Sequence, residues 1–396
     1  MNKFGMFIHW GLYAMTGEHE QALAKLDIPF DEYEALATKF NPTEYDPEEW
    51  VLLAKNAGMK YICFTTKHHD GFCMWDTKYT DYNIMNTPYG KDVLKMLAEA
   101  CEKHGMLLSL YYSNPDWHHE NGHNIFSTHQ LRSPSPEKGD TVKYREYVKN
   151  QLKELLTNYG KIYTFFWDIP PRIQDESLNQ LIRSLQPDIL INDRGWDKGD
   201  FSTPERKIPE GHFERMTEAC QSVGEQSWGY RVDEDYYSIR FLISSIDKIM
   251  AKGGSYLLNV GPMPNGKIPE KSVKMIQRIG DWYNRMEGAL EDHEPSPFFN
   301  EYANFKCIET YKNGKTYIHL CDGANSSALI FLVAPYLVRP KRARLLNNGQ
   351  DLRIRFGNLP DFGVRNTGLS GGPFLSIADL PVDDFENEVM IVELEW

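Results

Sequence analysis

Titratable and hydrogen-bonding side chains follow short apolar segments at several places in this sequence. The run "KIYTFFW" ends at Asp168, and "MKYICFTT" leads into Lys67, His68 and His69. A charged side chain at the end of an apolar segment costs free energy unless it is paired or has a functional role. The residues that follow such segments and could do chemistry are His9, His68, His69, Tyr111, Asp168 and Arg194. Because such residues recur after several apolar segments, the sequence predicts that they form one polar site.

Asp168 lies in "FFWDIPP" and is the strongest candidate for a reacting group. Pro170 and Pro171 delay any helix until about Asp175, which is the better helix N-cap. A carboxylate held beside Phe166 suits a nucleophile or a base.

Hydrolysis of a glycosidic bond takes two carboxylates, one as nucleophile or base and one as acid. The long segment after Arg194 supplies two candidates, Glu205 in "STPE" and Glu218 in "TEAC". Each lies in an otherwise uncharged tetrapeptide, and the sequence leaves the choice open. Trp228 in the same segment is a candidate platform for a sugar ring, with a buried core tryptophan as the alternative.

His68 and His69, with Asp70, also suggest a metal site. Adjacent residues on a strand point to opposite faces, and the chain contains no HExxH or HxH pattern. Hydrogen bonding to a polar neutral substrate is therefore the favoured interpretation, and no metal or cofactor is predicted.

Helical and apolar segments alternate along residues 1–294, and the helical segments end near glycines such as Gly58, Gly105 and Gly160. The apolar segments are short and continuous, as in parallel strands that are covered on both faces. This predicts a (β/α)8-like TIM-type barrel, with its site at the carboxyl ends of the strands. A doubly wound open sheet is the alternative, disfavoured because no GxGxxG follows an early strand.

The pattern changes after about residue 294. Apolar stretches such as "KTYIHLC" and "SALIFLVA" are separated by turn residues such as "KNG" and "NNG". This predicts a C-terminal antiparallel β-sandwich over 295–396, after a catalytic barrel over 1–294.

Composition narrows the function classes. The 396 residues carry a formal net charge of -13, which disfavours nucleic-acid and membrane-surface partners. No run of about 18 apolar residues occurs. The six cysteines lie mostly inside apolar runs, so buried thiols and a cytoplasmic location are expected, although a signal peptide could have been removed. The oligomeric state stays open, a homo-oligomer included.

The motifs, taken together, resemble the α-L-fucosidases of glycoside hydrolase family 29. They include "FGMFIHWGLY", "TTKHHDGF", "LYYSNPDWHH", "INDR", "GDFSTPE" and "KGGSYLLNVGP", in family order over about the first 265 residues. The resemblance implies a barrel with a C-terminal β-sandwich and metal-independent, retaining cleavage of terminal α-L-fucose from fucosylated glycans.

By motif position the resemblance also implies roles for individual residues. Asp168 takes the position of the nucleophile, and Glu205 that of the acid/base in one branch, with Glu218 as the runner-up. The implied sugar ligands are His9, Glu18, His68, His69, Tyr111 and Arg194, with Trp228 as an aromatic wall. Two departures from the family pattern leave substrate preference open. His19 stands where the family often has tryptophan after the glutamate. Phe166, two residues before Asp168, also stands where the family often has tryptophan. A non-catalytic carbohydrate-binding barrel and a metal-dependent barrel hydrolase are the alternative functions.

Overall fold

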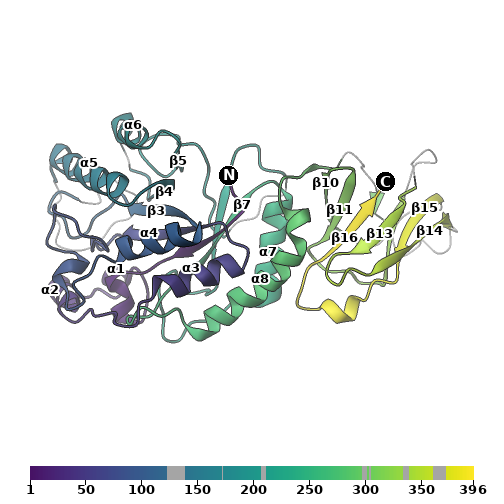
Figure 1. Cartoon of the computed structure of the whole chain (residues 1–396), viewed down its shortest axis with the longest axis horizontal. Coiled ribbons are helices and arrows are strands. Elements are labelled where there is room, and N and C mark those ends of the chain that lie inside the picture. The colour runs from purple at the N-terminus through teal and green to yellow at the C-terminus, as the bar shows by residue number, and fades with distance from the viewer. Residues whose placement is uncertain are drawn as a thin grey trace. The chain divides into compact units, whose positions relative to one another are not determined.

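The computed structural model describes residues 1–122, 139–171, 173–206, 211–296, 301–302, 305–332, 339–359 and 372–396. The chain divides into two compact units (Figure 1). The first comprises Met1–Lys207, Arg215–Tyr237 and Tyr256–Gln277, and the second Ile208–Glu214, Ser238–Ser255 and Arg278–Trp396. A domain boundary at residue 294 stays a prediction.

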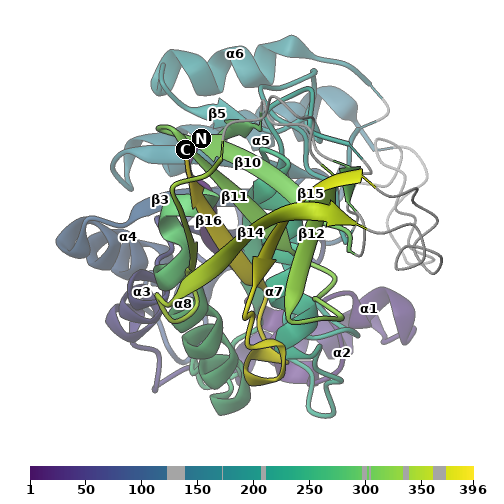
Figure 2. The ribbon, with the colours of Figure 1, turned by 90° about the vertical axis from the view of Figure 1, so that its right-hand side faces the viewer.

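The second unit contains an antiparallel sheet of nine strands in the order β8-β10-β11-β16-β13-β14-β15-β12-β9. The strands are β8 (Glu294–Pro295), β9 (Glu301–Tyr302), β10 (Ile308–Lys312), β11 (Lys315–Leu320), β12 (Ala328–Leu332), β13 (Arg342–Leu345), β14 (Asp351–Leu359), β15 (Gly372–Ala378) and β16 (Met390–Glu395). Strand β14 pairs with both β13 and β15, and so joins two halves of the sheet (Figure 2). Both halves contribute to one apolar core, for example Ile318 and Val392 from one and Phe331 and Ile377 from the other. The predicted C-terminal antiparallel β domain is therefore confirmed.

The first unit is built on a curled sheet of seven strands in the order β5-β4-β3-β2-β1-β7-β6. They are β1 (Phe4–Ile8), β2 (Tyr61–Lys67), β3 (Leu107–Ser113), β4 (Ile162–Asp168), β5 (Leu190–Ile191), β6 (Glu218–Ser222) and β7 (Ser255–Val260). The pairings from β5 across to β7 are parallel, and β1, β2 and β7 are buried throughout. The edge strands β5 and β6 are linked through residues 201–205, which form isolated parallel bridges with Asn192, Thr217 and Cys220. The fold is thus the predicted TIM-like type, a curled parallel sheet rather than a doubly wound open one.

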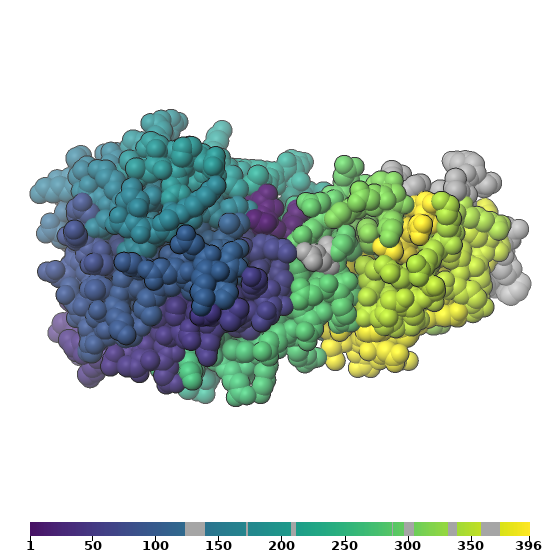
Figure 3. All heavy atoms as spheres, in the orientation of Figure 1, coloured from purple at the N-terminus to yellow at the C-terminus, as the bar shows by residue number. Residues whose placement is uncertain are grey.

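The described residues of the chain form eight α-helices. They are α1 (Ala22–Lys25), α2 (Phe30–Glu34), α3 (Pro47–Asn56), α4 (Val93–His104), α5 (Thr141–Thr157), α6 (Glu176–Leu185), α7 (Ile239–Ala251) and α8 (Glu270–Leu290). Helix α3 contacts β2 and α4 contacts β3, and the two helices pack side by side (Figure 1). The purple and blue surfaces of the N-terminal part of the chain adjoin in the space-filling view (Figure 3). Asp175 caps α6 by accepting a hydrogen bond from Ser177 N, as its sequence position predicts.

Short 3-10 helices lie at Leu12–Thr16, Ala35–Thr38, Ile84–Asn86 and Val382–Phe385. Gly105 ends α4 with φ 66°, a left-handed conformation that favours glycine. All six cysteines are free thiols, and five of them are buried. Among the helices of the described residues, none has the length and apolar character that crossing a membrane requires.

Candidate active site

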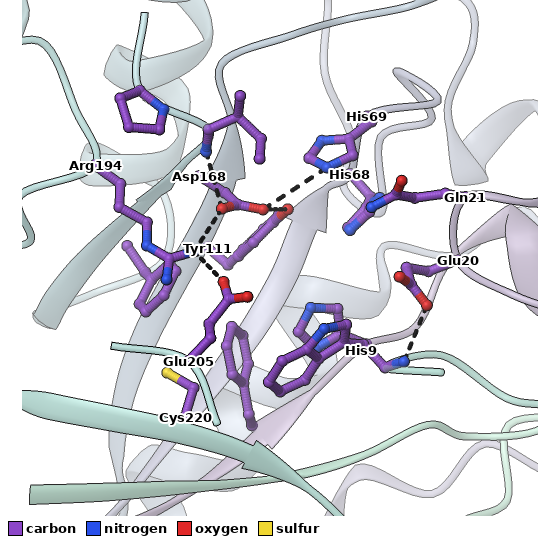
Figure 4. A pocket seen from close by; sticks show the side chains of 15 residues that line it. His9, Glu20, Gln21, His68, His69, Tyr111, Asp168, Arg194, Glu205 and Cys220 are labelled. Carbon is purple, nitrogen blue, oxygen red and sulfur yellow. Dashed lines mark hydrogen bonds and ion pairs between the residues drawn. The ribbon is translucent and has the colours of Figure 1, made fainter. Parts of the chain in front are cut away.

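A cavity of about 310 Å³ opens at the edge of the sheet where the strands of the first unit end (Figure 4). Parallel strands deliver their carboxyl ends to one edge, so residues far apart in sequence meet there. The predicted site residues that line this cavity are His9, His68, His69, Tyr111, Asp168, Arg194, Glu205 and Trp228. Glu18 and Glu218 do not line it.

Asp168 ends β4, and three donors hold its carboxylate. The Tyr111 hydroxyl donates to Oδ2 at 2.7 Å, while Ile169 N and Arg194 Nη1 donate to Oδ1 at 2.9 and 3.1 Å. Burial by itself would raise the pKa of Asp168, but the Arg194 charge, His69 and these hydrogen bonds lower it to about 2. Asp168 is therefore a fixed, ionised carboxylate, which is the state a nucleophile requires.

A single guanidinium connects Asp168 with Glu205. Arg194 follows β5, and Glu205 lies in the segment that bridges to β6. Nη1 of Arg194 donates to Asp168 Oδ1 and also to Glu205 Oε1. Two hydrogen bonds on one nitrogen keep the two accepting oxygens within roughly 6 Å of each other. The two carboxylates therefore lie close enough together to flank one glycosidic bond, as the paired carboxylates of glycosidases do.

The hydrogen bonds around His9 define its tautomer. The side-chain nitrogen of Asn259 donates to Ser222 Oγ at 3.0 Å and to the Trp228 carbonyl at 2.7 Å. Its Oδ1 must then accept from His9 Nδ1, which lies 2.6 Å away. Burial lowers the pKa of His9 to about 4, despite the nearby Glu20 charge. Neutral His9 thus presents Nε2 as an acceptor for a hydroxyl group.

A similar relay orients His69. Ser113 Oγ donates to the Pro115 carbonyl at 2.6 Å, so it accepts from His69 Nδ1 at 2.6 Å. His69 Nε2 then lies toward Asp168 Oδ2, 3.8 Å away. The neighbouring ring of His68 stacks on Tyr111, with centroids 5.5 Å apart and an interplanar angle of 4°. The two adjacent histidines therefore reach the same cavity from the loop after β2.

A metal ion would find three candidate ligands in this cavity. His68, His69 and Asp168 each offer one ligand atom, and these atoms lie within 4.8 Å of one another. Both Asp168 oxygens already accept protein hydrogen bonds, and the nearby guanidinium would repel a cation. Asp70, the third ligand suggested by the sequence, accepts instead from the Tyr33 hydroxyl at 2.8 Å. The arrangement therefore favours a polar, uncharged ligand.

One side of the cavity is apolar. Its lining there comprises Phe7, Phe166, Cys220 and Trp228, which pack together in one cluster. The rings of Phe7 and Phe166 have centroids 5.2 Å apart, and Trp228 stacks on His9 at 5.4 Å. An apolar wall opposite hydrogen-bonding groups suits a small sugar that carries a methyl group.

Glu20, rather than Glu18, reaches the cavity. Oε2 of Glu20 accepts from Ser227 Oγ at 2.8 Å and from Trp228 N at 2.9 Å, and the side chain is buried. Glu18 is exposed, and its carboxylate lies 3.8 Å from Arg231. In "GEHE" the two acids are two residues apart in a segment without regular structure, so no local signal selects one. Gln21, also missed by the sequence analysis, lines the same rim.

The structure places Glu218 away from the cavity. Glu218 is the first residue of β6, and its Oε2 accepts a hydrogen bond from the hydroxyl of Tyr61, the first residue of β2. The cavity lies beyond the opposite end of β2, where His68 and His69 follow the strand. Glu218 is fully buried, and burial raises its pKa to about 7 although the Tyr61 bond lowers it. It therefore lies too far toward the amino end of the sheet to act as an acid/base partner.

Comparison with known proteins gives concordant results. The family model for α-L-fucosidases matches residues 1–287. The human tissue α-L-fucosidase is 26% identical over 331 residues, covering 74% of this chain and 68% of that protein. The α-L-fucosidase of Dictyostelium discoideum is 25% identical over 372 residues, covering 83% and 78%.

Solved structures agree over nearly the whole chain. Isoenzyme 1 of α-L-fucosidase from Paenibacillus thiaminolyticus is 31% identical, with a TM-score of 0.85 over 99% of this chain and 96% of that one. A family 29 α-L-fucosidase from Bacteroides thetaiotaomicron, captured as a covalent intermediate with 2-fluoro-fucosyl fluoride, is 26% identical with a TM-score of 0.78, over 99% and 94%.

Proposed function

This chain belongs to the α-L-fucosidase family, glycoside hydrolase family 29, and we propose which of its residues carry the reaction and how. It is a glycoside hydrolase that releases terminal α-L-fucose, and the covalent intermediate of the Bacteroides relative supports a retaining mechanism. The observation that carries the residue assignment is the single guanidinium nitrogen that contacts both Asp168 and Glu205.

In the first step Asp168 is the nucleophile. A carboxylate oxygen of Asp168 attacks the anomeric carbon of fucose, and the bond from that carbon to the aglycone oxygen breaks. The leaving oxygen takes a proton from Glu205, which is half-exposed at the cavity. The low pKa of Asp168 keeps it ionised for this attack at any working pH above about 2.

In the second step Glu205 becomes the base. It takes a proton from a water molecule, whose oxygen attacks the anomeric carbon and displaces Asp168. Once Asp168 is esterified it carries no charge, and Arg194 is left with Glu205 as its anionic partner. The shared guanidinium therefore stabilises the anion that each step requires, first on Asp168 and then on Glu205.

The remaining cavity residues bind the sugar. His9 Nε2 accepts a hydrogen bond from a sugar hydroxyl group, His69 Nε2 faces the sugar beside Asp168, and buried Glu20 offers a carboxylate from the opposite side of the cavity. The apolar wall that includes Trp228 takes the methyl group of fucose. A homo-oligomer and a cytoplasmic location stay predictions, for sedimentation and cell fractionation to test.

The Asp168→Gly variant tests the assignment. Loss of the nucleophile should lower kcat on an aryl α-L-fucoside by several orders of magnitude. Added azide should partly restore turnover and give fucosyl azide of inverted configuration, which NMR identifies. Wild-type-like hydrolysis by the variant would remove Asp168 from the mechanism.

A further inference from the structure

The chain makes an unfavourable turn directly after Asp168. Ile169 has φ +57°, in the left-handed region that β-branched residues avoid. Pro170 follows it, and a proline further restricts the residue before it. Strained backbone of this kind persists only where neighbouring groups hold it, and it is concentrated at functional sites.

Asn114 lies in the loop after β3 and contacts this turn. Its backbone N donates to the Asp168 carbonyl at 3.0 Å. Its side-chain Nδ2 lies 3.0 Å from the same carbonyl, 3.0 Å from the Ile169 carbonyl and 3.1 Å from the Arg194 carbonyl. Three acceptors around one amide nitrogen fix which way the amide points. Asn114 thus contacts both sides of the strained peptide and the backbone of the residue that pairs with Asp168.

The other atoms of Asn114 indicate what this amide is for. Its Oδ1 is buried and has no hydrogen-bond partner among the described residues, which costs stability. Its own carbonyl accepts from the Tyr144 hydroxyl at 2.5 Å, which anchors the residue to α5. The side chain is therefore held for the contacts of its nitrogen, at some cost to the fold.

The turn directs one donor onto the reacting carboxylate. The N–H of Ile169 belongs to the same peptide as the Asp168 carbonyl that Asn114 holds, and it points to Asp168 Oδ1 at 2.9 Å. If Ile169 relaxed to a negative φ by a flip of this peptide plane, the N–H would turn away and Asp168 would lose one of the three donors that hold its carboxylate. We propose that Asn114 is a positioning residue that clamps the left-handed turn and so fixes the nucleophile. This inference rests on the proposed role of Asp168 as that nucleophile.

A double-mutant cycle with Ile169→Gly tests the clamp. Glycine adopts positive φ without strain, so Ile169→Gly should make the clamp dispensable. In the wild-type background, Asn114→Ala should lower kcat and kcat/KM on an aryl α-L-fucoside together, by about 10- to 100-fold. In the Ile169→Gly background the same substitution should cost about threefold or less. Loss of the Ile169 N–H bond should also raise the pKa of the Asp168 carboxyl above about 2, which an NMR titration of the free enzyme measures directly.

Asn192→Ala is the matched control. Asn192 is also buried and also clamps β4, because its Oδ1 accepts from Trp167 N at 2.9 Å and its Nδ2 donates to the Trp167 carbonyl at 2.8 Å. Its bonds end one residue before Asp168. Its substitution should lower Tm, cost the same factor in both backgrounds and leave the pKa of Asp168 unchanged.

Equal costs of Asn114→Ala in the two backgrounds, or wild-type kcat in the single variant, would overturn the proposal. If Asn114→Ala does not fold, Asn114→Ser serves in the same cycle, since its hydroxyl keeps one donor. Azide distinguishes a failure of the proposed nucleophile from a failure of the proposed clamp. It should rescue Asp168→Gly but not Asn114→Ala, whose nucleophile is intact. Failure of azide with Asp168→Gly would count against the proposed function, whereas an additive cycle with successful rescue would count against the clamp alone.

Discussion

Replacing Glu205 by alanine removes the proposed proton donor and leaves the nucleophile in place. The Glu205 carboxylate shares Arg194 Nη1 with Asp168, so it lies close enough to reach the glycosidic oxygen. General acid–base catalysis contributes about 10²- to 10⁴-fold. We expect kcat/KM for a fucosylated sugar, whose oxygen leaves poorly without a proton, to fall by about that factor. For a dinitrophenyl fucoside, which needs little protonation, the loss should be about tenfold or less.

The second step gives a separate signature. Without Glu205 no base activates water, so the fucosyl ester on Asp168 should accumulate, with a burst of dinitrophenol followed by slow turnover. Azide needs no base, and it should relieve this block and give fucosyl azide of retained configuration. Stopped-flow absorbance measures the burst, and NMR identifies the product. The retained product distinguishes this variant from Asp168→Gly, which should give the inverted azide.

Glu218→Gln serves as the control. Glu218 is buried against Tyr61 at the far end of β2, so its loss should change stability and form no fucosyl azide. The assignment to Glu205 is wrong if Glu218→Gln yields the retained azide, or if Glu205→Ala loses the same factor on good and poor leaving groups.

Three further outcomes follow from the same geometry. Because burial lowers the pKa of His9 to about 4, kcat/KM should fall as the pH drops through 4, and this limb should be missing from the residual activity of His9→Gln. Because burial raises the pKa of Glu218 from its usual 4.5 to about 7, the folded protein holds a proton that the unfolded chain releases, and wild-type stability should fall as the pH rises between those values. Denaturation of Glu218→Gln should lack this slope, with the difference from wild type changing by about 3 kcal/mol between pH 4.5 and 8, and a constant difference would contradict the buried, protonated carboxyl. The apolar wall with Trp228 should leave the extra hydroxyl of an α-L-galactoside unpaired, at a cost of about 1–3 kcal/mol, and equal kcat/KM on fucoside and galactoside would show that the wall does not contact that position.

The sequence was sufficient wherever local pattern determines structure. Short, continuous apolar runs between glycine-ended helices identify parallel strands, and parallel strands bring their carboxyl ends to one edge. The positions of His9, His68, Asp168 and Arg194 at that edge could therefore be predicted from the residues that follow each run. The role of Asp175 as the N-cap of α6 could also be predicted from local sequence, because the two prolines before it exclude an earlier start of the helix.

Tertiary structure decided the positions and partners of the residues that lie outside such patterns. "EACQS" is too polar to be recognised as a strand, yet residues 218–222 form β6, and its direction places Glu218 at the amino edge while Glu205 lies beside Arg194. In "GEHE" the choice of Glu20 over Glu18 depends on the distant donors Ser227 and Trp228. Hydrogen bonds between segments far apart in the chain leave no periodic trace in the sequence, and only the folded structure shows which acid they select.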